Sequence, residues 1–187
     1  MMSFLIKSKE VIETLEKTFK DEIYPTAVKD LAMYIKKIDS QNKILTIFGN
    51  GGSAADSQHF AAELVCTYED RERKPYKALA LTTDTSIISA WSNDFKYENI
   101  FERQIDAFKG TIGLAIGLST SGTSDNVILA LKKANKLGIK TCLICGNNDL
   151  SYKYIDYLFK IPSKNTATIQ TVTQITYHSI CAELEKS

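Results

Sequence analysis

The stretch KILTIFGNGGSAADSQHFAAEL (residues 43–64) decides the fold class. Its first seven residues form a short apolar run, as in a strand that is buried on both faces, and they lead into a glycine-rich turn. From residue 53 to about residue 67 the pattern favours a helix. A strand, a tight turn and a helix in this order are typical of proteins with a parallel sheet, so the segment predicts an α/β fold.

The same alternation continues to the end of the chain. Further short apolar runs lie at 77–83, 112–118, 141–146 and 157–162. Helical patterns lie at 84–92, 98–108, 124–136 and 166–185. Because parallel strands need crossover helices, we expect a three-layer sandwich in which helices flank a central, mostly parallel sheet of five strands.

The N-terminal part has a different pattern. Residues 3–38 repeat apolar positions at helical spacing, with Pro25 between two such runs, which predicts two helices or one kinked helix. With 187 residues, the chain is long enough for one sizeable core and short for two. We therefore expect a single domain over 1–187, made of a helical segment (1–38) and an α/β core (40–187).

Charge and hydropathy exclude several classes of partner. The chain has 23 basic and 22 acidic residues, so it has no net field to attract nucleic acid or an anionic membrane. No apolar run approaches the roughly 18 residues of a spanning helix, and nothing resembles an export signal. The expected location is the cytoplasm.

Two of the four cysteines form the pair Cys142-x-x-Cys145 inside the apolar run TCLICG. Such a pair can belong to a zinc knuckle or a redox site, but no second pair is present and the run is typical of a buried strand. We interpret these residues, with Cys66 and Cys181, as reduced core thiols.

The first of two unusual turns is Gly49-Asn50-Gly51-Gly52-Ser53. Its glycines allow the backbone to approach a ligand closely, and Ser53 could cap the following helix. The turn lacks the lysine of a P-loop and the G-x-G-x-x-G spacing of a dinucleotide site. On its own it is weak support for a binding site.

The second turn is Ser119-Thr120-Ser121-Gly122-Thr123-Ser124, ahead of a helix that begins near Asp125. Five hydroxyl side chains at a helix N-terminus offer many donors to phosphate oxygens. The alternative is an ordinary polar turn with one capping serine. A cap needs one hydroxyl and this turn has five, so we favour phosphate binding.

The only histidines are His59 and His178. His59 and Glu63 are one helical turn apart, a spacing that suits a divalent metal or acid/base chemistry but is also common in solvated surface pairs. Gln170, Gln174 and His178 follow one another at intervals of four on the last helix, where a solvent-facing polar stripe is the alternative. Neither set by itself is decisive.

Several motifs, taken together, resemble the sugar isomerase (SIS) domain of phosphoheptose isomerases. They are FGNGGSAADSQHFAAEL (48–64), ALTTDTS (80–86), SNDF (92–95), STSGTSDNV (119–127) and the Ile169-Gln170 pair with His178. The similarity keeps one order and spacing from about residue 40 to the C-terminus. It implies an SIS fold of the flavodoxin/Rossmann-like type, whose N-terminal helices pack in an oligomer, a homotetramer.

The resemblance also implies a site. It gives one Zn²⁺ per subunit with His59, Glu63, Gln170 and His178 as ligands, and Glu63 and His178 as the catalytic acid/base pair. The implied substrate-binding residues are Asn50, Gly51, Gly52, Glu63, Asn93, Asp94, Ser119, Thr120, Ser121, Ser124 and Gln170, to which we add Ser53 from the same turn. The expected reaction is the aldose–ketose isomerisation of D-sedoheptulose 7-phosphate to D-glycero-D-manno-heptose 7-phosphate, an early step towards ADP- or GDP-heptose for bacterial surface glycans such as lipopolysaccharide or capsule.

This chain departs from the family pattern in two places. The last helix usually has a motif close to RIQEMH, whereas residues 168–173 are TIQTVT, and the usually glycine-rich turn after TCLIC is Gly146-Asn147-Asn148-Asp149. Neither change touches an implied ligand.

One implied ligand pair raises a geometric question. Eight helical residues separate Gln170 from His178 by about 12 Å along the axis, so one ion joins them only through extended side chains, or a neighbouring subunit completes the site. Two alternatives to the expected function stay open: a non-catalytic SIS-domain binding or regulatory protein, such as one that binds a replication initiator, and an isomerase of another sugar phosphate.

Overall fold

A computed structural model describes residues 2–20, 22–149 and 151–186. Its centre is a five-stranded sheet of β1 (Ile44–Gly49), β2 (Ala78–Ala80), β3 (Ile112–Ser119), β4 (Lys140–Gly146) and β5 (Tyr157–Ile161). The strand order is β2-β1-β3-β4-β5, and every neighbouring pair is parallel. The predicted α/β class and five-stranded sheet are therefore confirmed.

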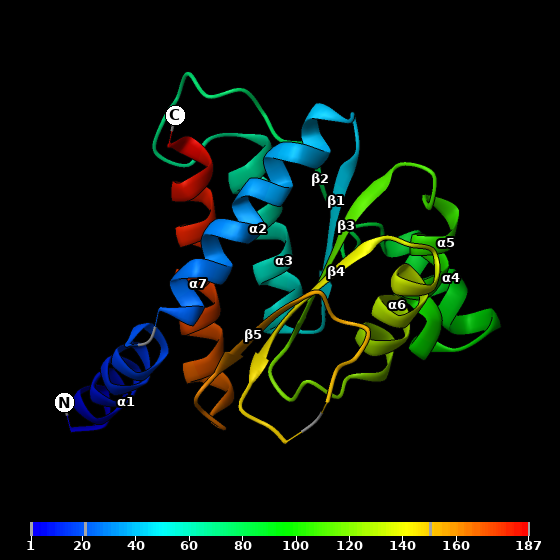
Figure 1. The fold of residues 1–187 in the computed structure, drawn as a ribbon. Coiled ribbons are helices and arrows are strands. Elements are labelled where there is room, and N and C mark those ends of the chain that lie inside the picture. Colours follow the sequence, from blue (N-terminus) through cyan, green and yellow to red (C-terminus); the bar gives the residue numbers. More distant parts are fainter. Residues whose placement is uncertain (1, 21, 150, 187) are drawn as a thin grey trace.

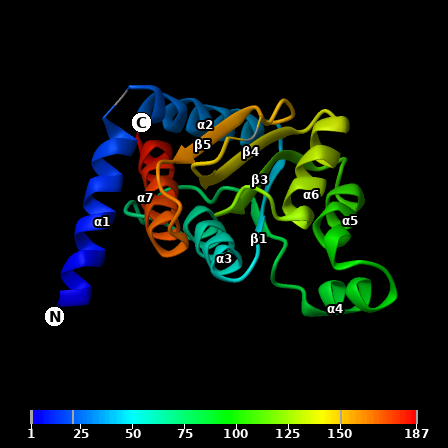
Figure 2. The ribbon, with the colours of Figure 1, turned by 90° about the horizontal axis from the view of Figure 1, so that it is seen from below.

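Helices cover both faces of the sheet, which gives the predicted three layers (Figure 1). One layer contains α2 (Ile23–Ser40), α3 (Gly52–Val65) and α7 (Thr166–Glu185). The other contains α5 (Ile100–Ala107) and α6 (Asp125–Lys136), with α4 (Thr85–Asp94) beyond them (Figure 2). Each layer has its own apolar cluster against the sheet, built around Phe60 and Val172 on one side and Phe101 and Val127 on the other.

The N-terminal break lies earlier than the sequence indicated. α1 (Met2–Phe19) ends before residue 20 and α2 starts at Ile23, so Pro25 lies in the first turn of α2 rather than between the helices. Proline is tolerated there because the first helical amides have no intrahelical acceptor to lose.

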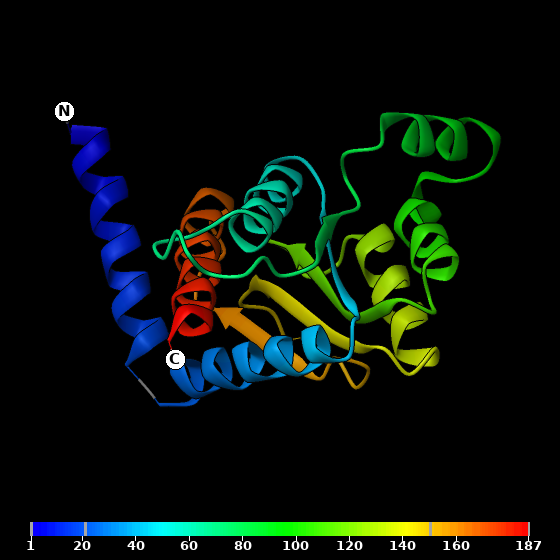
Figure 3. The ribbon, with the colours of Figure 1, turned by 90° about the horizontal axis from the view of Figure 1, so that it is seen from above.

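Helix α1 lies at the edge of the molecule beside α7, and its N-terminal end points away from the sheet (Figure 3). Its apolar side chains are largely exposed, with Phe4 at 72%, Leu5 at 58% and Ile12 at 55%. Such a surface is unusual for an isolated chain. None of the helices among the described residues is both long and apolar enough to cross a membrane.

The strand order places a topological switch point between β1 and β3. From β1 the chain passes to β2 on one side, and β3 then pairs with the other side of β1. In open α/β sheets the crevice at the carboxyl ends of two such strands is the usual ligand site. The two unusual turns of the sequence follow these two strands.

Candidate functional site

The glycine turn after β1 takes a backbone conformation that favours glycine. Gly51 has φ +55°, in the left-handed region, and it is the N-cap of α3. The expectation that Ser53 caps this helix is wrong. Ser53 lies inside the helix and is buried, and its amide donates to the Asn50 carbonyl at 2.9 Å, because the helix already starts at Gly52.

The turn after β3 gathers its hydroxyls into one network. Ser119 Oγ lies 3.0 Å from Ser124 Oγ and 3.5 Å from Ser121 Oγ, and the Thr123 amide and hydroxyl both donate to Ser121 Oγ. Ser124 is the N-cap of α6, yet its side chain makes no capping bond. Helix capping therefore does not account for the hydroxyls, and an anion at this N-terminus would meet several donors.

A pair of asparagines joins the two turns. Asn50 Nδ2 donates to Asn126 Oδ1 and Asn126 Nδ2 donates to Asn50 Oδ1, each at 2.8 Å, and the Tyr97 hydroxyl donates to Asn50 Oδ1 at 2.9 Å. Asn126 is 3% exposed and belongs to the first turn of α6. The two turns thus form one surface at the carboxyl edge of the sheet.

Two predicted substrate residues lie elsewhere. Asn93 and Asp94 are exposed at the C-terminal end of α4, where the Asn93 amide donates to the Asp94 carboxylate at 2.9 Å. Within the described part of the chain, neither makes a hydrogen bond to the glycine or serine turn.

Helices α3 and α7 bring the predicted metal ligands together. His59, Glu63 and His178 each offer a ligand atom, and these atoms lie within 4.8 Å of one another. His59 Nε2 is 3.0 Å from Glu63 Oε1, and the two side chains are 40% and 21% exposed. Two imidazoles and a carboxylate at this spacing are a donor set for a divalent transition metal.

His178 adds an independent sign that the cluster can take an ion. Its Nε2 is buried, and no hydrogen-bond partner for it exists among the described residues. Burial lowers the pKa of His178 and the neighbouring His59 acts in the same direction, which favours the neutral imidazole that binds metals. A buried nitrogen without a partner is costly, and a bound cation would satisfy it.

The fourth predicted ligand, Gln170, takes a different position. Its amide packs against Gly52 so closely that a Cβ built on that glycine would overlap it. Gln170 therefore contacts the start of α3, whereas His59 and Glu63 are two or more turns further along the same helix. In a single chain the helix separates Gln170 from His178 by about 12 Å, as its spacing predicts.

Three further residues that no sequence pattern indicated lie next to the cluster. The Tyr177 hydroxyl is 2.8 Å from His59 Nδ1, the Tyr68 ring lies 5.3 Å from the His178 ring, and Arg73 Nη2 donates to the Glu63 carbonyl at 2.7 Å. The only available signal was that Tyr177 precedes His178. The other two contacts depend on how the loop after α3 folds back.

That loop, the charged segment 67–77, is held by Glu185 at the end of α7. The Glu185 carboxylate accepts from the amides of Tyr68, Glu69 and Asp70 and from Arg73 Nε, at 3.0–3.1 Å. The loop lies beside His178, and a buried ion pair anchors it.

The cysteine interpretation holds for Cys142, Cys145 and Cys181, which are buried and free, whereas Cys66 is exposed. Cys142 belongs to the apolar cluster under α2, α3 and α7, and Cys145 to the cluster on the opposite face. Burial raises the pKa of the Cys145 thiol to about 11 and that of Cys181 to about 12. Opposite faces of one strand cannot present two thiolates to one ion.

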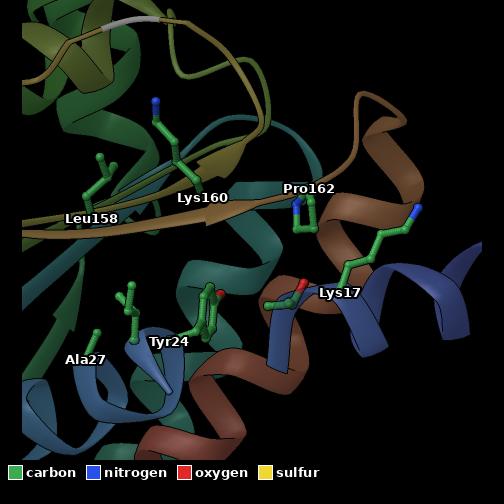
Figure 4. Close-up of a pocket in the computed structure, with 8 residues that line it drawn as sticks. Lys17, Tyr24, Ala27, Leu158, Lys160 and Pro162 are labelled. Carbon is green, nitrogen blue, oxygen red and sulfur yellow. The ribbon is translucent and has the colours of Figure 1, made fainter. Parts of the chain in front are cut away.

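A separate hollow of about 320 Å³ lies where α1 and α2 meet β5 (Figure 4). Tyr24, Ala27 and Leu158 form its apolar wall, and Lys17 and Lys160 stand at its edges. It contains none of the predicted site residues.

Comparison with known proteins places these features in one family. The model of the SIS domain matches residues 3–146. A phosphoheptose isomerase of Aquifex aeolicus is 42% identical to the chain over 187 aligned residues, which cover 94% of this chain and 97% of that protein. The structure of a phosphoheptose isomerase from Neisseria gonorrhoeae has a TM-score of 0.80 at 30% identity and 99% coverage of both chains. Another, from Francisella tularensis, has a TM-score of 0.84 at 25% identity over both whole chains.

Proposed function

The chain belongs to the SIS-domain family and, within it, to the phosphoheptose isomerases, and on that premise we propose that it converts D-sedoheptulose 7-phosphate to D-glycero-D-manno-heptose 7-phosphate. The reaction is an aldose–ketose isomerisation. The observation that supports it most is the cluster of His59, Glu63 and His178, in which a buried imidazole nitrogen has no partner among the described residues.

The ion that we propose for this cluster is Zn²⁺, one per subunit. Two histidines and one carboxylate form one of the ligand sets found in catalytic zinc sites. When bound, zinc polarises a carbonyl and stabilises the negative charge that develops on its oxygen. Gln170, the fourth ligand implied by the family, would have to leave Gly52 or come from a neighbouring subunit.

We assign the proton transfers to Glu63 and His178. The reaction moves one proton between two adjacent carbons through an enediol, so it requires a base, an acid and support for an oxyanion. One Glu63 oxygen is 3.0 Å from His59 Nε2, and the other remains to accept the proton from carbon. His178, neutral because burial lowers its pKa, exchanges the hydroxyl proton. Because coordination to a metal weakens a carboxylate as a base, Glu63 would serve as the base most readily if it held the ion only loosely.

The phosphate of the substrate is assigned to the serine turn. Ser119, Thr120, Ser121 and Ser124 supply hydroxyls at the N-terminus of α6, where the helix dipole favours an anion. The turn of Asn50, Gly51, Gly52 and Ser53, with Gln170 against it, lies beside the serine turn and would contact the sugar hydroxyls. Asn93 and Asp94 lie at the end of α4. They would reach the substrate only if α4 moved towards the turns or if a neighbouring subunit contributed them.

We further propose that the enzyme is a cytoplasmic homotetramer. Gln170 and His178 are too far apart for compact coordination within one chain, and the exposed apolar side chains of α1 need a partner surface. Light scattering after size exclusion would give four times the 20.9 kDa chain mass. The product would feed the synthesis of nucleotide-activated heptose for a surface glycan.

A substrate panel with metal analysis tests this function. Purified protein is assayed with ketose phosphates of five, six and seven carbons, beside Glu63→Gln and His178→Gln. We expect the wild type to contain stoichiometric zinc and to turn over the seven-carbon substrate. We expect the turnover rate of both variants to be at least about 10²-fold lower.

Glu183→Gln is the matched control, because Glu183 is also on α7 and pairs with Lys186 at the surface. It should retain full activity. Turnover of a shorter sugar alone would assign a different isomerase activity. Sugar-phosphate binding without turnover by the zinc-loaded protein would make it a binding protein.

A further inference from the structure

Tyr177 occupies an unusual position next to the metal cluster. It is fully buried on α7, and its hydroxyl lies 2.8 Å from Nδ1 of His59 on α3. The other ring nitrogen of His59, Nε2, faces Glu63 Oε1 at 3.0 Å. Both nitrogens of this histidine therefore have a defined partner.

This arrangement matters because a neutral imidazole has only one lone pair. One ring nitrogen has a proton and donates, and the other can accept a proton or bind a metal. If Nε2 is to bind an ion beside Glu63, the proton has to be on Nδ1 and needs an acceptor there. The Tyr177 oxygen is the group that the structure provides.

We propose that Tyr177 is a positioning residue of the metal centre: its hydroxyl accepts the Nδ1–H of His59 and so supports the tautomer whose Nε2 lone pair is available to an ion held between His59 and Glu63. The inference rests on the metal site of the proposed function. Metal-bound histidines generally have such an outer partner, and its loss typically lowers metal affinity 10- to 100-fold.

The surroundings of Tyr177 hold its hydroxyl in place. Its ring stacks on Phe60 with centroids 5.1 Å apart and planes at 14°, and it meets the rings of His59 and His178 edge-on. A hydroxyl held in this way can accept the Nδ1–H of His59 without adding charge to the site.

The chain supplies a matched control in Tyr24. It is also buried, and its hydroxyl is 2.8 Å from Thr176 Oγ1, on the residue before Tyr177. Tyr24→Phe removes a buried hydroxyl that joins α2 to α7, and Tyr177→Phe removes one that joins α7 to α3. Both variants keep the aromatic ring. Only the second touches a ligand of the metal.

The experiment measures zinc affinity of the full-length wild type and both variants by competition with a chromophoric chelator, and their unfolding midpoints in urea. We expect Tyr177→Phe to bind zinc 10- to 100-fold more weakly than the wild type, and Tyr24→Phe to bind it as tightly as the wild type. Without metal, the two variants should lose a similar amount of stability. The ¹⁵N spectrum of zinc-loaded wild type should show His59 protonated at Nδ1.

The outcomes separate the two proposals. The role of Tyr177 would be overturned if Tyr177→Phe bound zinc as tightly as the wild type, or if both variants lost zinc affinity equally. It would also be overturned if His59 were protonated at Nε2 in the zinc-loaded protein. If the wild type binds no divalent metal at all, the metal site of the proposed function fails, and this inference fails with it.

Discussion

Replacing Glu185 by glutamine should lower the free energy of unfolding by about 3–5 kcal/mol, the usual cost of breaking a buried ion pair. The carboxylate accepts four hydrogen bonds: Oε1 from the Tyr68 amide and Arg73 Nε, and Oε2 from the amides of Glu69 and Asp70. A glutamine has one oxygen, so two of the four donors lose their acceptor whichever way the amide points. The Arg73 and Glu185 side chains are only 8% and 7% exposed, so water has little access to the ion pair between them.

The assay is urea unfolding followed by circular dichroism, with Glu183→Gln as the control. Glu183 pairs with Lys186 three residues away on the surface, and such pairs contribute about 0–1 kcal/mol. Because Arg73 also donates to the Glu63 and Leu64 carbonyls, the Glu185 variant should loosen the end of α3 and reduce activity. An effect of Glu185→Gln within 1 kcal/mol of the control would refute the reasoning.

The same pair predicts a pH dependence. Burial alone would raise the pKa of Glu185, but the hydrogen bonds from the Asp70 amide, Arg73 and the amides of Glu69 and Tyr68 together lower it below its ordinary value of 4.5. The unfolded chain therefore takes up the proton first as the pH falls. The contribution is complete above about pH 5.5 and is lost through and below pH 4.5, so the stability difference between wild type and Glu185→Gln should shrink over that range. A constant difference from pH 7 to pH 4 would contradict the shift.

Three further predictions concern the turns and the thiols. Asn126→Ala should raise the KM for the sugar phosphate about tenfold with a smaller change in kcat, because losing both hydrogen bonds to Asn50 uncouples the two binding turns at a net cost of about 1.4 kcal/mol; an unchanged KM would contradict this. Gly52→Ala should displace the Gln170 amide and lower kcat/KM about 100-fold, whereas Gly110→Ala, where an added Cβ meets nothing within 4 Å, should have no effect, and equal activity of the two variants would show that Gln170 is not needed at that position. A thiol reagent should label one cysteine per native chain, the exposed Cys66, and rapid labelling of more than one would contradict the burial of the others.

Much of the fold could be predicted because the apolar patterns are local. The last helix was predicted over 166–185, which are its bounds in the structure. The predicted bounds of β1, β3, β4 and β5 lie within one residue of the observed ones. β2 is shorter than predicted because it is an edge strand that pairs with β1 over only three residues. The break between α1 and α2 was misplaced because proline in a first turn looks, in sequence, the same as proline between helices.

The site was harder to predict because its contacts join residues far apart in the chain. His59 and His178 belong to different helices, and only family resemblance linked them. The Tyr177–His59 bond, the Arg73–Glu185 pair and the Asn50–Asn126 pair span 118, 112 and 76 residues, and no local pattern indicates any of them. Ser53 was misread as a cap because the backbone conformation of Gly51, which starts the helix two residues earlier, is not visible in sequence.

The most direct test of the account is to follow sedoheptulose 7-phosphate in D₂O by NMR with the zinc-loaded wild-type protein. A base and an acid that move a proton through an enediol should yield a seven-carbon aldose 7-phosphate and introduce solvent deuterium at the carbon next to the carbonyl, and His178→Gln should do neither. Absence of aldose and of deuterium exchange in the wild type, with zinc bound and the fold intact, would contradict the claim that this chain is a phosphoheptose isomerase.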